Sequence, residues 1–239
     1  MIQQDKILIF GKNLKVKTGS HVVLLYQDES ELVDVLSDYF SEGIKNNNSC
    51  VMVCQNEDLQ NKIITKIENK NVLSKKQIIE KLVFIKSKEF YFSKNKFNAD
   101  TIYKKIDEDI AKNTLCGLRA ASDMSWVNNN NFNEVHQYEK ELSSRYHTEN
   151  IILLCAYPSK DMNTLQIIKT LQSHTLILFK EDGVWKISHA VERKIFENKI
   201  EELEQFTKHA VNRELRMIEL KATINKLEKE LEKYQKNSQ

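Results

Sequence analysis

Short apolar runs alternate with amphipathic segments between residues 21 and 189. Each run of about five apolar residues has the length of a buried strand, and the segments between them have helical spacing. The first helical segment, for example, carries a stripe at three- and four-residue intervals formed by Leu32, Val35, Leu36, Tyr39 and Phe40. The predicted strands are 22–26, 50–54, 82–85, 115–119, 151–157 and 176–179, and the predicted helices are 30–46, 57–71, 99–113, 132–147 and 161–173.

This alternation predicts βαβ units and a mostly parallel sheet with helices on both faces. Right-handed crossovers then lead to an α/β doubly wound sandwich. The end of the pattern differs, because Asp182-Gly183 separates two apolar runs and predicts a hairpin. We therefore expect an antiparallel edge on the sheet. Two N-terminal capping pairs are also predicted, Asp28 with Glu31 and Asn131 with Glu134.

From about residue 190 the pattern becomes that of one unbroken helix. Steps of three and four give twelve seam positions, ten of them apolar, which is typical of a coiled coil. Some 45 residues of helix would be roughly 68 Å long, more than one small domain can cover. The sequence thus predicts a domain over 1–189 and a coiled-coil helix over 190–239, or else a helix folded back on its own domain. The dimer contacts expected are Leu203, Phe206, Met217, Leu220, Ile224, Leu227 and Leu231.

Composition narrows the function classes. The 36 basic and 34 acidic residues leave a net charge of +2, which predicts no general attraction to nucleic acid or to an anionic membrane. No apolar stretch is long enough to span a bilayer, and no signal-peptide pattern stands at the N-terminus. We expect a cytoplasmic location. The cysteines lie in apolar runs, where a free thiol behaves as a small core residue.

The loop after the first predicted strand lacks the chemistry of a nucleotide site. A phosphate-binding loop needs glycines and a lysine, whereas residues 27–30 read Gln-Asp-Glu-Ser. Two carboxylates outweigh the half charge of a helix N-terminus and would repel a triphosphate. Neither a G-x-S-x-G nor an H-E-x-x-H motif is present. The sequence predicts no enzyme activity and no cofactor.

Six phrases, in order, resemble one family. They are GSHVVLLY (19–26), FYFSKNKFNAD (90–100), GLRAASDMSW (117–126), YEKEL (138–142), LLCAYP (153–158) and SHTLIL (173–178). Together they are similar to the MEDS domain, the methanogen/methylotroph sensory domain first noted in a dichloromethane-responsive repressor. The resemblance covers about residues 15–185 and implies a RecA-like fold without its ATP-binding loop, used to sense small molecules.

The chain departs from the family pattern at three places. Asp123 replaces a glutamate, Thr175 replaces a proline, and the segment CAYPSKDM differs from the usual sequence. The resemblance therefore does not carry over a ligand. The C-terminal segment also resembles the signalling helix that links sensory modules to histidine kinases or other output domains.

Open α/β sheets bind ligands beyond the carboxyl ends of their strands, which gives some of the candidate ligand residues. His21 and Tyr26 flank the first strand and match positions of the MEDS domain, and His174 precedes the last parallel strand. Arg119 is expected to end the fourth strand there, paired with a ligand, with Glu139 or in a structural ion pair. Trp126 would wall an apolar pocket or pack in the core, and Cys155 is assigned to the core. The ligand-binding residues predicted are Tyr26, Arg119, Asp123, Trp126, Tyr157, His21 and His174.

The leading hypothesis is a non-enzymatic sensor that binds a small ligand at the carboxyl edge and dimerises or relays through its helix. A histidine kinase or a transcriptional regulator is the expected output partner. The alternative is a degenerate RecA-like ATPase that serves as a ligand-free interaction scaffold. A metal site of His21, Cys155 and His174 is conceivable from ligand types, but no zinc-motif spacing supports it, so no metal is predicted.

Overall fold

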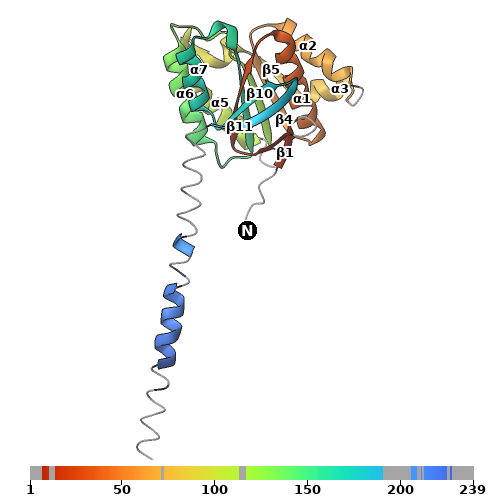
Figure 1. Cartoon of the computed structure of the whole chain (residues 1–239). Coiled ribbons are helices and arrows are strands. Elements are labelled where there is room, and N and C mark those ends of the chain that lie inside the picture. Colours follow the sequence, from red (N-terminus) through yellow and green to blue (C-terminus); the bar gives the residue numbers. More distant parts are fainter. Residues whose placement is uncertain are drawn as a thin grey trace, which may run out of the picture. The chain divides into compact units, whose positions relative to one another are not determined.

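The structure is a computed structural model, shown in Figure 1, and it describes residues 7–10, 14–70, 73–112, 117–190, 206–208, 211, 213–224 and 227. The chain divides into two compact units, Met1–Ala190 and Val191–Gln239. Within the described residues, no helix is both long enough and apolar enough to cross a membrane.

The first unit is built on a seven-stranded sheet in the order β11-β10-β3-β9-β8-β4-β5. All neighbouring strands are parallel except β10 and β11. The predicted fold class is confirmed: a doubly wound α/β sheet with an antiparallel edge. The strands are β3 (Ser20–Tyr26), β4 (Ser49–Cys54), β5 (Leu82–Lys86), β8 (Leu118–Asp123), β9 (Ile151–Pro158), β10 (Leu176–Glu181) and β11 (Val184–His189).

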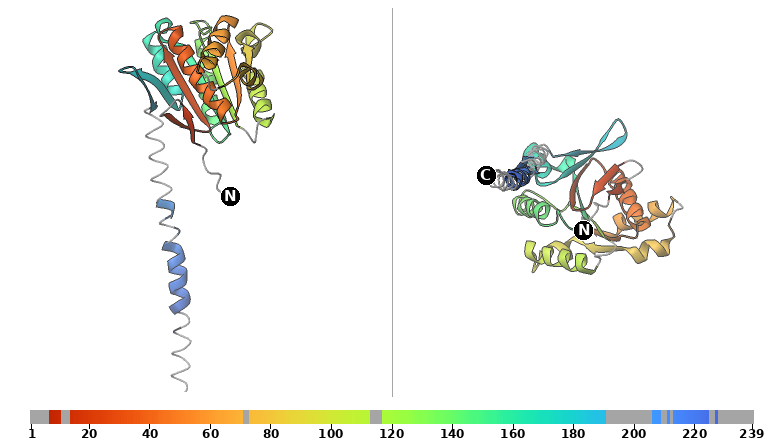
Figure 2. Two further views of the ribbon diagram at one scale, coloured as in Figure 1. Left: turned by 90° about the vertical axis from the view of Figure 1, so that its right-hand side faces the viewer. Right: turned by 90° about the horizontal axis from the view of Figure 1, so that it is seen from below.

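Helices cover both faces of this sheet, and the two layers are visible in Figure 2. The first layer packs on one apolar cluster and comprises α1 (Glu29–Lys45), α2 (Glu57–Glu68) and α3 (Lys75–Lys81). The second packs on the opposite cluster and comprises α4 (Ser87–Tyr91), α5 (Ala99–Lys112), α6 (Phe132–Arg145) and α7 (Thr164–Ser173). We call the second face the α6 face.

The apolar pattern did not predict several short elements. They are the strand pairs β1 (Ile7–Phe10) with β2 (Leu14–Lys17) and β6 (Phe92–Ser93) with β7 (Lys96–Phe97), the helices α3 and α4, and a 3₁₀ turn, η1 (Ser159–Asp161). Strands of two to four residues and helices of five to seven span at most about two periods of an apolar repeat, which is too short for the repeat to be recognised.

Local chemistry explains where the elements begin. Asp28 caps α1, since its side chain accepts a hydrogen bond from the Glu31 backbone N–H at 3.0 Å. The second capping prediction is wrong. Asn131 precedes α6, but its side chain accepts from the Asn128 N–H instead and makes no cap. The predicted hairpin is confirmed: Asp182 and Gly183 have φ of 49° and 76°, the left-handed pair that a tight β10–β11 turn requires.

The position predicted for the fourth strand is wrong. The expectation was 115–119, but β8 runs from Leu118 to Asp123. Its last four residues, Ala-Ala-Ser-Asp, include no bulky apolar side chain, so the apolar pattern ended before the strand did. Arg119 therefore lies near the amino end of β8, remote from the carboxyl edge, and the proposed pairing with Glu139 is wrong as well.

Arg119 instead binds within the first helix layer. It is 1% exposed, and its guanidinium donates to the Tyr39 carbonyl at 2.9 Å and to Asn48 Oδ1 at 3.1 Å. The guanidinium also lies 5.3 Å from the centre of the Tyr39 ring. Gly43 permits this packing, because a Cβ there would stand 2.7 Å from Arg119 Cδ. Burial lowers the pKa of Arg119.

In the second unit, the described residues 206–208, 211, 213–224 and 227 are helical. Five predicted seam residues are described here, namely Phe206, Met217, Leu220, Ile224 and Leu227, and all are exposed. Leu203 and Leu231 lie outside the described residues. Dimerisation through this helix stays a prediction.

Replacing Arg119 by alanine should lower the free energy of unfolding by about 3–5 kcal/mol, because it empties the space of a large buried side chain and removes its hydrogen bonds to the Tyr39 carbonyl and to Asn48 Oδ1. Arg145, whose guanidinium binds Asp107 at the surface, is the matched control and should cost about 1 kcal/mol or less. Urea denaturation of both variants measures the difference. Equal, small losses would contradict the structural role of Arg119.

Candidate functional site

At the β3–α1 junction, acidic side chains bind the backbone N–H groups. Asp28 takes the Glu31 N–H, and Glu31 Oε2 accepts from the Gln27 N–H at 2.9 Å. The chain's own carboxylates thus occupy N–H groups that a phosphate would need.

Tyr26 and Asp123 meet at the carboxyl edge on the α1 face. Tyr26 donates to Asp123 Oδ1 at 3.3 Å, while Ser125 donates its hydroxyl to Oδ2 at 2.8 Å and its backbone N–H to Oδ1 at 3.1 Å. Burial raises the pKa of Asp123 and that of Tyr26. These three residues bind one another, and their polar groups are satisfied without a ligand.

Trp126 and Tyr157 belong to the opposite, α6 face. The half-buried Trp126 ring lies 4.6 Å from the Tyr91 ring and 5.2 Å from the Phe92 ring, within an aromatic cluster. Tyr157 donates to Glu139 Oε1 at 3.2 Å. The predicted carboxyl-edge residues are therefore divided between two faces, and Arg119 is absent from both groups.

A different set of residues converges on the α6 face. His21 on β3, Glu139 on α6, Cys155 on β9 and His174 just before β10 are all buried, and one N, O or S atom from each lies within 4.8 Å of all the others. We call these four residues the His-Glu-Cys-His cluster. Glu139 Oε2 lies 2.8 Å from His21 Nε2 and 3.3 Å from His174 Nε2. His21 Nε2 lies 3.3 Å from Cys155 Sγ, and the two imidazole rings are 4.0 Å apart.

Burial and the neighbouring cluster residues together shift the pKa values of Glu139 and Cys155. Burial by itself raises the pKa of Glu139, but the contacts with His174 and His21 reverse the effect and lower that pKa below its usual value. Glu139 is therefore a carboxylate. Burial and the nearby Glu139 charge raise the pKa of the Cys155 thiol well above its ordinary value.

The sequence identified this cluster only in part. His21 and His174 were ligand candidates, whereas Cys155 was assigned to the core and Glu139 to a salt bridge with Arg119. The residues are separated by 118, 16 and 19 positions, which matches no compact metal or catalytic motif. Glu139 lies in the YEKEL phrase and Cys155 in the LLCAYP phrase, both of which resemble the family. That resemblance was the one signal in the sequence that could have identified these two residues.

A family model described as the methanogen/methylotroph, DcmR sensory domain (MEDS) matches residues 20–175. The chain belongs to the MEDS family. All four cluster residues lie within the matched part of the MEDS domain. No curated protein matches the chain.

Among solved structures, this MEDS domain is similar to the flagellar accessory protein FlaH from Methanocaldococcus jannaschii. The identity is 15%, the match covers 71% of this chain and 76% of FlaH, and the TM-score is 0.40. Nothing about function follows from so distant a similarity. In the sheet of this MEDS domain, β3, the first strand of the sheet in the chain, lies between β9 and β10, the last two parallel strands.

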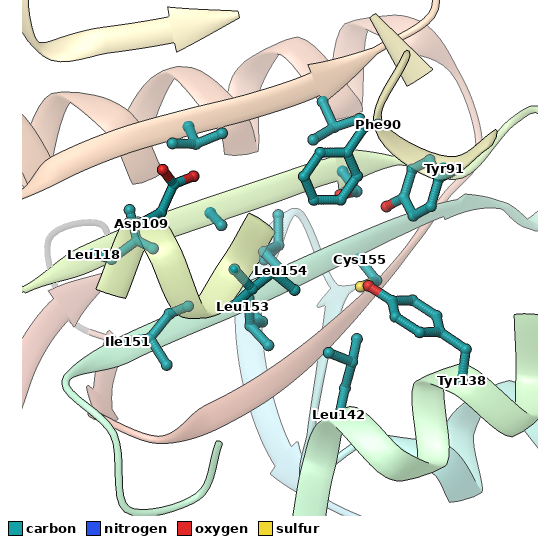
Figure 3. Close-up of a pocket in the computed structure, with 15 residues that line it drawn as sticks. Phe90, Tyr91, Asp109, Leu118, Tyr138, Leu142, Ile151, Leu153, Leu154 and Cys155 are labelled. Carbon is teal, nitrogen blue, oxygen red and sulfur yellow. The ribbon is translucent and has the colours of Figure 1, made fainter. Parts of the chain in front are cut away.

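An apolar cavity lies beside the cluster, between the sheet and α4, α5 and α6 (Figure 3). The space open to the centre of a water-sized molecule is about 30 Å³. Cys155 belongs both to the cavity wall and to the cluster, and the Tyr138 hydroxyl points toward its sulfur in Figure 3. The other lining residues are apolar except for Ser122, Asp109 and the tyrosines, and include Val53, Phe90, Ala120, Leu142 and Leu153.

Tyr157→Phe should lower the free energy of unfolding by about 1–3 kcal/mol, because Glu139 Oε1 would keep its buried charge and lose its donor. Tyr103→Phe is the matched control, since Tyr103 donates to the exposed Glu141 and water can replace it there. Chemical denaturation of both variants checks the difference. A smaller loss for Tyr157→Phe than for Tyr103→Phe would contradict the description of the cluster.

Proposed function

We propose that this MEDS domain is a non-enzymatic sensor that binds a very small, largely apolar molecule in the cavity beside Cys155. Membership in a sensory family supports the general role. The observation that carries the specific proposal is the apolar cavity that touches a buried polar cluster at one residue. Apolar walls with a few placed polar groups are the usual composition of a small-molecule site.

Cavity size limits the ligand class. An engineered apolar cavity of about 150 Å³ binds benzene, while a volume of about 10–15 Å³ holds one water molecule. A cavity of about 30 Å³ suits a ligand of only a few heavy atoms unless its walls repack. This placement replaces the carboxyl-edge site expected around Tyr26 and Arg119, whose polar groups bind one another or the first helix layer.

The absence of enzyme activity is part of the same proposal. The N-terminus of α1 is occupied by the carboxylates of Asp28 and Glu31. Without a bound metal ion, burial and the Glu139 charge raise the pKa of the Cys155 thiol, which disfavours the free thiolate that nucleophilic catalysis requires.

The C-terminal helix would carry the response, as a homodimer contact or as a contact with a kinase or regulator, in the cytoplasm. Its exposed apolar residues recur at coiled-coil spacing, which supports a partner for this surface. A ligand can signal only if it binds two arrangements of the protein with different affinity. The same exposed residues also favour the second candidate, a ligand-free interaction scaffold.

Xenon is a suitable first probe for the cavity, because it is apolar and needs little space. Adding xenon to the full chain should shift the NMR methyl signals of Val53, Leu142 and Leu153, which line the cavity. Ala120→Val should abolish these shifts by filling the space. Ala111→Val, the same change at an exposed position of α5, should leave them unchanged.

Saturable shifts that survive Ala120→Val, or no shifts in the native chain, would contradict the cavity as the ligand site. A native chain without shifts that still assembles through its helix would favour the scaffold.

The helix surface is tested by a matched pair of double variants. Leu220→Lys with Ile224→Lys places charges on the predicted seam, whereas Leu215→Lys with Ile218→Lys makes the same changes off the seam. Light scattering should give a dimer mass for the native chain and the off-seam variant, and a monomer mass for the seam variant. A monomeric native chain, or dissociation of both variants, would contradict the predicted homodimer.

A further inference from the structure

We propose that the His-Glu-Cys-His cluster is a binding site for one divalent transition-metal ion, with Zn²⁺ as the best match. The ligand atoms are Nε2 of His21 and His174, Oε2 of Glu139 and Sγ of Cys155. The inference goes beyond the sensory role and does not require a ligand in the neighbouring cavity.

Hydrogen bonds set the tautomer of His174. Its Nδ1 lies 2.7 Å from the Thr170 carbonyl oxygen, which can only accept, so Nδ1 carries the proton. In the neutral ring Nε2 then has a free lone pair, directed at Glu139 Oε2. A metal-binding histidine usually donates its other ring N–H to a carbonyl or carboxylate in this way, which fixes the orientation of the ring.

The same argument applies to His21. Its Nδ1 lies 2.9 Å from Ser143 Oγ, and the Ser143 hydroxyl donates its single proton to the Ser173 carbonyl at 2.7 Å. Ser143 must therefore accept from His21 Nδ1–H. His21 Nε2 is left with its lone pair facing Cys155 and Glu139.

Four possible metal-ligand atoms thus face one another in a buried space. Within the described part of the chain, Glu139 Oε2 and His174 Nε2 make no hydrogen bond, although they lie 3.3 Å apart. A carboxylate oxygen and an imidazole lone pair at that distance repel each other unless a proton or a metal cation lies between them.

A divalent ion would leave the group neutral. One divalent cation balances one thiolate and one carboxylate beside two neutral imidazoles, and burial tolerates a neutral group.

Ligand type and spacing point to zinc. Two imidazoles, a thiolate and a carboxylate match its preference for N and S ligands with an occasional oxygen. Metal bonds of 2.0–2.3 Å in a tetrahedron separate the ligand atoms by about 3.3–3.8 Å. The separations found here, 2.8 Å to at most 4.8 Å, bracket that range. The ion would join β3, β9, α6 and the start of β10.

Cobalt titration tests the proposal, because Co²⁺ occupies zinc sites and absorbs visible light. The chelator-treated full chain should bind one Co²⁺ with the bands of a tetrahedral ion and a thiolate charge-transfer band, and Zn²⁺ should displace it. Cys155→Ser should remove the charge-transfer band, whereas Cys54→Ser, a change at another buried cysteine, should retain it.

Affinity supplies a second readout. His174→Ala should weaken Co²⁺ binding about a hundredfold or more. Ser143→Ala removes the hydrogen bond to His21 Nδ1 and should weaken Co²⁺ binding about tenfold. His136→Ala on the same helix as Glu139 should bind like the native chain. Failure of the native chain to bind Co²⁺ or Zn²⁺ would overturn the proposal, as would an unchanged charge-transfer band in folded Cys155→Ser. The xenon experiment is unaffected by either result.

Discussion

The parallel pairing of β3 with β9 at the centre of the sheet is the constraint on which the site depends. Its register sets His21 opposite Leu153 and Val23 opposite Cys155, so that His21 and Cys155 are diagonal neighbours on the α6 face. A shift of one residue would turn both side chains to the other face. Because β3 and β9 are separated by more than 120 residues, this contact exists only in the folded sheet.

Two buried polar groups stabilise opposite faces of that sheet in different ways. On the α1 face, Arg119 is bound by a backbone carbonyl and an amide oxygen and has a structural role. On the α6 face, the Glu139 carboxylate contacts two histidines and a tyrosine. Its Oε2 and the Nε2 of His174 face each other without a hydrogen bond. Among the described residues each group keeps a buried polar atom without a hydrogen-bond partner, namely Arg119 Nη2 in the first group, and Glu139 Oε2 and His174 Nε2 in the second.

The arrangement suits a domain of a sensory family. Carboxylates of the β3–α1 junction bind N–H groups that a phosphate would need, and the buried His-Glu-Cys-His cluster lies under the α6 face. There an apolar cavity and a polar cluster share Cys155. Protein interiors are close-packed and transmit strain. A change in packing at that sulfur would therefore displace neighbouring side chains at the centre of the sheet.

Sequence alone determined the fold class and most element positions, because strand length, helical spacing and the Asp-Gly turn are local signals. It also excluded a phosphate loop and proposed His21 and His174. Only the tertiary structure decided that Arg119 is structural and that Glu139 and Cys155 join the histidines. The last four residues of β8, Ala-Ala-Ser-Asp, have no apolar pattern to read. Contacts among residues 21, 139, 155 and 174 depend on strand order and register, which no local pattern contains.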